Sequence, residues 1–204
     1  MKNICVGISG VGGYVPEKIV TNHDLSKIVE TSNEWIIERT GIHERRIADD
    51  DMATSDIATK AAINALEDAR LRPEDIDLII VATVTADHAF PSTACIIQKN
   101  IGAVKAAAFD ISVGCSGFVY GLSIGENFIK SGTYDKVLVI GAETLSRVVD
   151  WQERNTCVLF GDGAGACVLE KCEEGFGILS IELGSDGSNG EVLVQPAGGS
   201  RLPA

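Results

Sequence analysis

The sequence contains few histidines and few positive charges. Its 204 residues include only three histidines, the last of them His88, and 17 Lys and Arg against 29 Asp and Glu, for a net charge of −12. This negative balance argues against nucleic acid or an anionic membrane as the main partner. The chain has no Cys-x-x-Cys pair, and with so few histidines it predicts no metal site.

Long apolar runs are absent as well. No stretch approaches the ~20 residues that a membrane-spanning helix needs. The first apolar segment starts at residue 4, almost at the N-terminus, so we expect no signal peptide. Most of the six cysteines lie within apolar runs, which is typical of buried, reduced thiols. These features together predict a cytoplasmic protein.

Strand and helix patterns alternate along the chain. Continuous apolar segments predict buried strands, and amphipathic segments between them predict helices. We expect strands at 4–11, 43–47, 78–83, 106–111, 136–141, 157–160, 164–170 and 178–183, and helices at 22–30, 32–40, 54–70, 92–100 and 117–130. This order predicts an α/β fold whose sheet is covered by helices on both faces. Residues 186–204 are rich in Gly, Ser and Pro and predict a loop.

Cys115 is the strongest candidate for a catalytic residue. It lies between the apolar strand 106–111 and the helix 117–130, and Gly114 interrupts the pattern just before it. At the N-terminus of a helix, the dipole and the free backbone N–H groups stabilise a thiolate. The same N–H groups can receive the oxyanion that forms when the sulfur attacks a thioester. The alternative is a structural cysteine packed at a helix start. No histidine follows Cys115 to serve as a downstream base.

Two other motifs have simpler interpretations. The glycine-rich segment 161–166 looks like a dinucleotide-binding loop, but it lies between strand-like runs rather than between a strand and a helix. We expect tight turns and close backbone packing there. The basic spot Glu44, Arg45 and Arg46 is typical of a solvated edge.

Five motifs in order resemble one family. They are residues 31–42 (TSNEWIIERTGI), 88–92 (HAFPS), the Cys115 segment, 160–166 (FGDGAGA) and 186–188 (DGS). The chain resembles the N-terminal part of β-ketoacyl-acyl-carrier-protein synthase III, a thiolase-like condensing enzyme. The resemblance implies a duplicated fold, in which two similar halves form a five-layered α-β-α-β-α sandwich. Residues 1–172 would be the N-terminal half with the nucleophile, and 173–204 the truncated start of the C-terminal half.

The resemblance also implies roles for several residues. Trp35 and Arg154 match the pair that sandwiches the adenine of coenzyme A, and an indole face and a planar guanidinium both stack well on a purine. Thr31 and Arg39 match positions that line the same nucleotide site. Phe90 matches a residue that closes the acyl pocket of the partner subunit in a homodimer. The alternatives are a helix anchor for Trp35, a surface charge for Arg154 and a core aromatic for Phe90. We expect His88 to be structural.

The implied reaction starts fatty-acid synthesis. Cys115 would accept an acetyl or other short acyl group from its coenzyme A thioester. A decarboxylative Claisen condensation with malonyl-acyl-carrier protein would follow, without a metal or redox cofactor. The family completes its catalytic set with a His and an Asn in the second half, and neither has a counterpart here. We therefore expect no condensation by this chain alone. A half sandwich would also expose apolar surface, so we expect association or aggregation.

Three alternatives remain open. The first is a related condensing enzyme that uses another acyl-CoA, for example in secondary metabolism. The second is a non-catalytic half-domain that serves as a structural or dimerising partner. The third is a module that binds coenzyme A without a covalent step.

Overall fold

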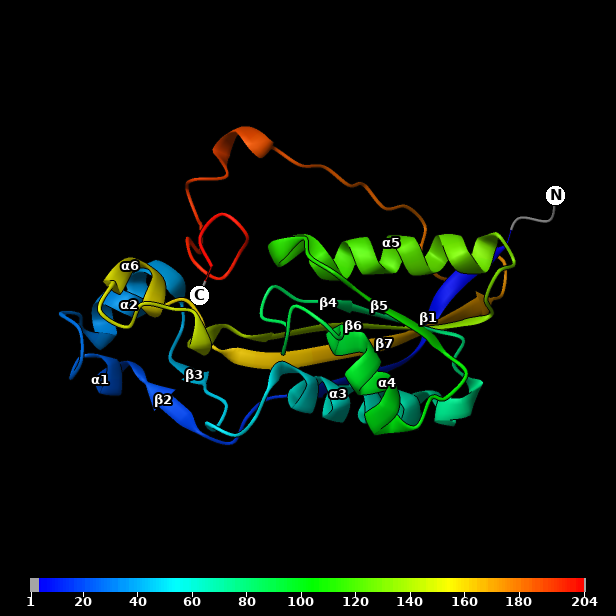
Figure 1. The fold of residues 1–204 in the computed structure, drawn as a ribbon, viewed down its shortest axis with the longest axis horizontal. Coiled ribbons are helices and arrows are strands. Elements are labelled where there is room, and N and C mark those ends of the chain that lie inside the picture. The colour runs from blue at the N-terminus through cyan, green and yellow to red at the C-terminus, as the bar shows by residue number, and fades with distance from the viewer. Residues whose placement is uncertain (1–3, 204) are drawn as a thin grey trace.

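A single five-stranded sheet forms the centre of the protein (Figure 1). The computed structural model describes residues 4–203. The strand order is β1-β7-β6-β4-β5, and a separate two-stranded sheet pairs β2 with β3. The strands are β1 (Cys5–Tyr14), β2 (Ile19–Thr21), β3 (Glu44–Arg46), β4 (Leu78–Ala82), β5 (Ala107–Ile111), β6 (Lys136–Thr144) and β7 (Asp162–Cys172). The helices are α1 (Asn22–Leu25), α2 (Asn33–Thr40), α3 (Thr54–Ala69), α4 (Thr93–Ile101), α5 (Gly117–Lys130) and α6 (Arg154–Cys157).

The sheet combines a parallel part with an antiparallel part. Strands β4, β5 and β6 are parallel, and β7 runs antiparallel to both β6 and β1. All five residues of β4 are buried, as expected for a central strand covered on both faces. The expected α/β fold is therefore confirmed. The carboxyl ends of the three parallel strands lie at the same end of the sheet, and the turn that contains Cys115 follows β5.

Helices cover both faces of the sheet (Figure 1). Helices α3 and α4 pack on one face with the apolar side of the α3 pattern turned inward, and α5 packs on the other. Three glycines of α5, Gly117, Gly121 and Gly125, lie directly over the sheet. A Cβ at these positions would lie 2.8 Å from Ala82 Cβ, 2.7 Å from Val139 Cγ1 and 2.9 Å from Leu169 Cδ1. The helix therefore lies closer to the sheet than any side chain would allow.

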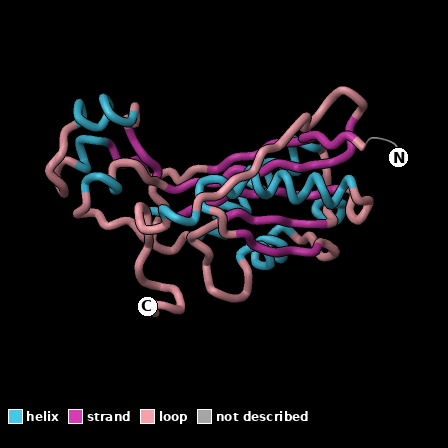
Figure 2. The backbone as a smooth tube through the Cα atoms, turned by 90° about the horizontal axis from the view of Figure 1, so that it is seen from above, coloured by secondary structure: helices cyan, strands magenta, loops and turns pink. Residues whose placement is uncertain are grey.

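A small lobe extends from one end of the sheet (Figure 2). It comprises α1, α2, α6 and the β2–β3 pair. Its core consists of Leu25, Ile36, Cys157 and Val158. Arg45 is buried beside this core and donates to Asn22 Oδ1 at 2.9 Å, to Val158 O at 3.2 Å and to Val20 O at 3.1 Å. The expectation of a solvated basic edge is therefore wrong for Arg45, whose guanidinium joins three segments of the lobe.

One expected helix is much shorter in the structure, and two expected strands are absent. The helix expected at 22–30 ends at Leu25, where the Ser26 hydroxyl donates to His23 O at 2.7 Å. The strand expected at 157–160 is absent, because Glu153 caps the short helix α6 that ends at Cys157. Residues 178–183 form no strand. The glycine-rich segment is also not a series of turns, because most of it is the start of β7.

The segment 173–203 lies largely over the surface, and among its residues the structure shows a single short 3₁₀ turn, Gly187–Asn189. Several apolar side chains in it are exposed, including Leu179 (86%) and Val192 (82%). Helix α5 adds Val119, which is 44% exposed. Exposed apolar side chains therefore occur both on the segment 173–203 and on helix α5.

Gly12 offers a test of the packing between β1 and α3. A Cβ at Gly12 would overlap the backbone of Ala61 and Ala65 in α3, whereas the nearest atom to a Cβ at Gly13 is Ala164 O at 3.8 Å. We expect Gly12→Ala to lower the free energy of unfolding by about 2 kcal/mol or more. Gly13→Ala is the matched control and should change it by less than about 0.5 kcal/mol. Urea titration of the two variants makes the comparison, and equal stabilities would contradict the packing described.

The exposed apolar side chains predict self-association. We expect the isolated chain to form oligomers or aggregates at micromolar concentration, because large apolar patches are rarely left exposed on monomers. Analytical ultracentrifugation measures this directly. Replacing Leu179 and Val192 with Ser should reduce the association, whereas a monomeric wild-type chain over the whole concentration range would refute the prediction.

Candidate functional site

Cys115 lies in the turn that joins β5 to α5. The turn is a short 3₁₀ segment, Gly114–Ser116, and α5 begins at the next residue, as the sequence predicted. Gly114 has φ = +56°, a left-handed conformation that a residue with a side chain rarely adopts. The Cys115 side chain is exposed. The structure therefore presents this thiol to solvent at a helix N-terminus, where unpaired backbone N–H groups are concentrated.

A carboxylate at the end of β5 holds the neighbouring helix in place. Asp110 accepts hydrogen bonds from the backbone N–H groups of Thr93 and Ala94, both at 2.7 Å, at the first turn of α4. Ile111 O accepts from Thr83 N at 3.1 Å. The segment before Cys115 is thus tied to the end of β4 and to the start of α4.

Glu143 organises the loop after β4. Its carboxylate accepts from Val84 N at 2.8 Å, from Thr85 N at 3.1 Å, and from the hydroxyl of Thr85. The Thr54 hydroxyl donates to Thr85 O at 2.6 Å from the start of α3. Farther along the loop, Asp87 accepts from Ser55 N at 2.9 Å. These bonds fix the loop that continues toward Phe90.

Phe90 projects from this loop into solvent. Its side chain is 85% exposed, so within the described residues it is not the core aromatic that was one interpretation of the sequence. Exposing a large aromatic ring to water costs free energy, because most of its surface is apolar. Its position is that of a side chain available to a neighbouring molecule.

Trp35 and two arginines form a cluster on the small lobe. The guanidinium carbons of Arg39 and Arg154 each lie 4.5 Å from the centroid of the Trp35 ring. Arg154 also donates to Glu30 O at 3.2 Å, and Ser32 caps α2 by accepting from Trp35 N at 3.1 Å. The structure therefore brings together residues that are more than 100 positions apart in the sequence.

Thr31, which is close to Trp35 in the sequence, has a polar atom without a hydrogen-bond partner among the described residues. This atom is its buried hydroxyl oxygen. A buried hydroxyl without a partner is costly unless a ligand or water satisfies it. Thr31, Trp35, Arg39 and Arg154 are thus consistent with a site for a polar, aromatic ligand.

The Trp35–Arg154 stack is closed in this structure. A purine inserted between an indole and a guanidinium needs a separation of about 7 Å, which is twice a normal stacking distance. The observed 4.5 Å leaves no room for it. Arg154 therefore has to release Glu30 O and move away before a base can enter the stack.

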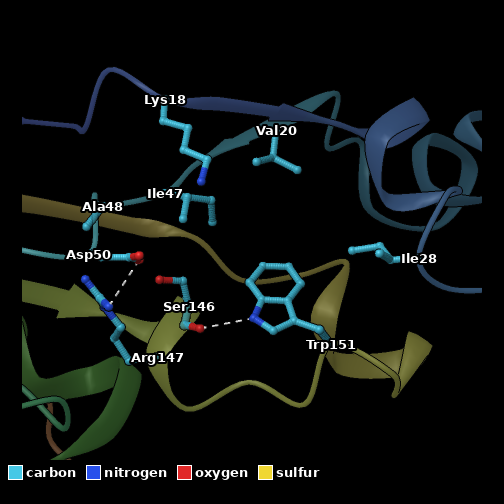
Figure 3. A pocket seen from close by; sticks show the side chains of 9 residues that line it. All are labelled: Lys18, Val20, Ile28, Ile47, Ala48, Asp50, Ser146, Arg147 and Trp151. Atoms are coloured by element: carbon cyan, nitrogen blue, oxygen red, sulfur yellow. Dashed lines mark hydrogen bonds and ion pairs between the residues drawn. The ribbon is translucent and has the colours of Figure 1, made fainter.

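Two open cavities lie near the base of the small lobe, each of about 280 Å³. Figure 3 shows the first, with Lys18 and Val20 at the top of the view, Trp151 below them and Arg147 beside Asp50. The second shares Asp50 and Arg147 with the first and extends to Thr85 and Asp87. Their described linings contain neither Cys115 nor the Trp35 cluster, so the site residues expected from the sequence do not enclose a cavity here.

Two buried or half-buried carboxylates, Glu143 and Asp162, were not predicted from the sequence. Asp162 is buried and accepts from Ala48 N at 2.7 Å, from Ser146 N at 2.9 Å and from the Ser146 hydroxyl at 2.6 Å. It lies in the glycine-rich segment, and its neighbour Gly161 packs against Arg45, because a Cβ at Gly161 would lie only 3.0 Å from Arg45 Cβ. The glycine motif therefore has a packing role. The signal that could have identified Asp162 is an acidic residue at the start of a predicted strand.

Two classes of site are not found in residues 4–203. No group of three or more His, Cys, Asp and Glu side chains is arranged to hold a metal ion there. Within the same residues, every helix is too short or too polar to span a bilayer.

Thiol reactivity tests the exposure of Cys115. Cys157 and Cys167 are buried, and burial raises the pKa of Cys167 to about 12. We expect iodoacetamide at pH 8 to label Cys115 and the exposed Cys95 at least about 100-fold faster than Cys167, because the thiolate is the reactive form. Peptide mapping by mass spectrometry measures the order, and early labelling of Cys167 would contradict the structure.

Comparison with known proteins connects these observations. Residues 109–187 match the family model for 3-oxoacyl-[acyl-carrier-protein (ACP)] synthase III. The β-ketoacyl-[acyl-carrier-protein] synthase III of Caldanaerobacter subterraneus is 64% identical over 203 residues, which are 100% of this chain and 61% of that protein.

Solved structures show the same relationship. The 3-oxoacyl-(acyl carrier protein) synthase III of Pseudomonas aeruginosa superposes with a TM-score of 0.91 and 38% identity, over 97% of this chain and 62% of that one. The priming β-ketosynthase of a polyketide biosynthetic pathway gives a TM-score of 0.81 and 38% identity, over 82% of this chain and 50% of that one. The chain spans about 61% of the curated relatives it matches. The recognition made from the motifs is therefore confirmed, because the chain is similar over its whole length to part of a β-ketoacyl-[acyl-carrier-protein] synthase III and has the thiolase-like fold of that family's solved members.

Proposed function

We propose that this chain supplies the nucleophile and the coenzyme A site of a condensing acyltransferase. The observation that carries the proposal is the exposed Cys115 on the turn between β5 and α5. Names of the relatives support the same class of reaction, since they are β-ketoacyl-[acyl-carrier-protein] synthases III. The proposed role of the complete protein is the first condensation of fatty-acid synthesis.

The proposed first step is acyl transfer to Cys115. The thiolate attacks the carbonyl carbon of acetyl-CoA or another short acyl-CoA, the oxyanion accepts hydrogen bonds from backbone N–H groups at the start of α5, and the coenzyme A thiolate leaves. Gly114, in its left-handed conformation, directly precedes Cys115 in this turn. The product is an acyl thioester on Cys115.

The Trp35 cluster is the proposed binding site for the nucleotide of coenzyme A. The adenine would stack between Trp35 and Arg154 once Arg154 has moved back, Arg39 would contact phosphate oxygens, and the Thr31 hydroxyl would gain a partner. The start of α5 follows the carboxyl end of β5, and α6 follows the carboxyl end of the parallel strand β6. Cys115 and the Trp35 cluster therefore lie toward the same end of the sheet, as one extended substrate would require.

The second proposed step needs a part of the protein outside this chain. A carbanion from decarboxylation of malonyl-acyl-carrier protein would attack the acyl-Cys115 thioester. This chemistry uses no metal or redox cofactor, and acyl-CoA is a substrate. We propose residues 1–172 as the first half of the duplicated fold, residues 173–204 as the start of the second, and the cytoplasm as its location.

Phe90 is the proposed acyl-pocket residue. In a homodimer it would enter the partner subunit and limit the length of the acyl chain. Its 85% exposure supports this role, because a side chain that serves a neighbouring subunit must leave its own. The hydrogen bonds of Glu143 and Asp87 would hold its loop in position.

A related condensing enzyme of secondary metabolism is the second candidate. The likeness to the priming β-ketosynthase of a polyketide pathway favours it. The two candidates share the acyl-Cys115 step and differ in the acyl group, so a panel of acyl-CoA thioesters separates them.

Incubation with acetyl-CoA tests the proposal. We expect the intact mass to increase by one acetyl group, and peptide mapping to place it on Cys115. Cys115→Ala should abolish the adduct. Arg154→Ala should slow acetylation about tenfold at limiting acetyl-CoA and less at saturation, because it removes one stacking partner.

Arg72→Ala is the matched control, since Arg72 is exposed and pairs with Asp75 away from the Trp35 cluster. It should leave the rate unchanged. If iodoacetamide labels Cys115 but acetyl-CoA does not, the proposed acyl transfer does not occur in this chain.

A further inference from the structure

Two cysteines face each other at the edge of the sheet. Cys5 is the first residue of β1 and Cys172 is the last residue of β7, and the antiparallel register pairs them directly. Both thiols are free and partly exposed. Among the described strands this is the only pairing of two cysteines, since Cys167, the other cysteine of β7, is opposite Val11 on β1 and Val139 on β6.

The register places the two side chains on one face of the sheet. Directly opposite residues of an antiparallel pair have Cβ atoms about 4.5–5.5 Å apart. A disulfide needs a Cβ separation of roughly 3.5–4.5 Å, so an approach of about 1 Å is enough. Both residues lie at strand termini, and β1 is an edge strand. Few backbone hydrogen bonds between β1 and β7 therefore have to change for the two residues to approach.

The Cys172 sulfur already lies toward β1. A Cβ placed on Gly7 would be 3.2 Å from Cys172 Sγ, and Gly7 projects to the same face as Cys5, two residues away. The missing side chain at Gly7 therefore leaves space for the Cys172 sulfur to lie over β1, on the face that Cys5 shares. The sulfur donates weakly to Phe176 O at 3.3 Å and packs against Gly177, where a Cβ would lie 2.8 Å from it. Burial raises the pKa of Cys172, and the neighbouring Cys5 and Glu173 add to this shift.

We propose that Cys5 and Cys172 form a redox-active dithiol that is oxidised to a disulfide by small-molecule disulfides such as oxidised glutathione. One thiolate attacks a sulfur of oxidised glutathione and releases one reduced glutathione. The second protein thiolate then attacks the protein sulfur of the mixed disulfide and releases another. Two protein thiols lose two protons and two electrons, and one glutathione disulfide becomes two thiols.

The disulfide would fasten the start of β1 to the point where the chain leaves β7. This point is next to Lys136, which begins β6, whereas Cys115 follows the end of the parallel strand β5. The dithiol and the proposed nucleophile are therefore at opposite ends of the sheet. Oxidation of the pair requires no acyl transfer, so failure of one proposal leaves the other standing.

The test uses the chain with its other exposed thiols removed. In a Cys95→Ser, Cys115→Ser background, oxidised glutathione should remove two hydrogens from the intact mass, and proteolysis should yield one linked peptide pair containing Cys5 and Cys172. The native chain should form this bond about tenfold faster than the same chain in concentrated urea, because the fold raises the effective concentration of the thiols.

Single variants complete the test. Adding Cys5→Ser should stop the reaction at a glutathione adduct on Cys172, and adding Cys172→Ser should stop it at an adduct on Cys5. The oxidised chain should also melt at a temperature several degrees higher, with dithiothreitol reversing the shift. Persistent adducts without closure in the chain that retains both thiols, a bond to Cys157 or Cys167, or equal rates with and without urea would each overturn the proposal.

Discussion

The close approach of α5 to the sheet sets the position of the turn that carries Cys115. Gly117, Gly121 and Gly125 replace side chains along one stripe of the helix, and the sheet fills the space with Ala82, Val139 and Leu169. Because Gly117 is the first residue of the helix and lies against Ala82, the turn before it is held against the end of β4. Cys115 is thereby fixed relative to the carboxyl ends of the parallel strands, where α/β folds commonly place their ligands.

Carboxylates near the ends of strands bind the loops at this end of the sheet. Asp110 binds the first turn of α4, Glu143 binds the loop after β4, and Asp162 binds backbone and side-chain donors of two separate segments. Each collects donors that would otherwise be unpaired at the ends of elements. Hydrogen bonds to carboxylate acceptors are stronger than those to neutral ones, so these contacts hold the loops in place at the strand ends.

In the Trp35 cluster the indole already has a partner. Arg154 lies over its ring, while the Thr31 hydroxyl lacks a partner among the described residues. At the nucleotide site that we propose here, a base entering between Trp35 and Arg154 would break a cation–π contact and a weak surface hydrogen bond, both of modest energy, and the ligand would pair with a buried hydroxyl. Because Arg154 lies on the four-residue helix α6, its movement need not disturb the sheet.

The sequence alone determined the elements with strong local patterns. The helix expected at 117–130 begins and ends as expected, the strand before it is one residue shorter than expected, and Cys115 occupies the turn between them. Periodicity succeeds here because it reports which side of an element is buried, and that depends on neighbours only a few residues away. The motifs likewise identified the family. Tertiary structure decided the antiparallel course of β7, the burial of Arg45, the stacking of Arg154 on Trp35 and the facing of Cys5 and Cys172. Each of these depends on partners that are distant in the chain, and no local pattern encodes which distant group will be adjacent once the sheet has formed.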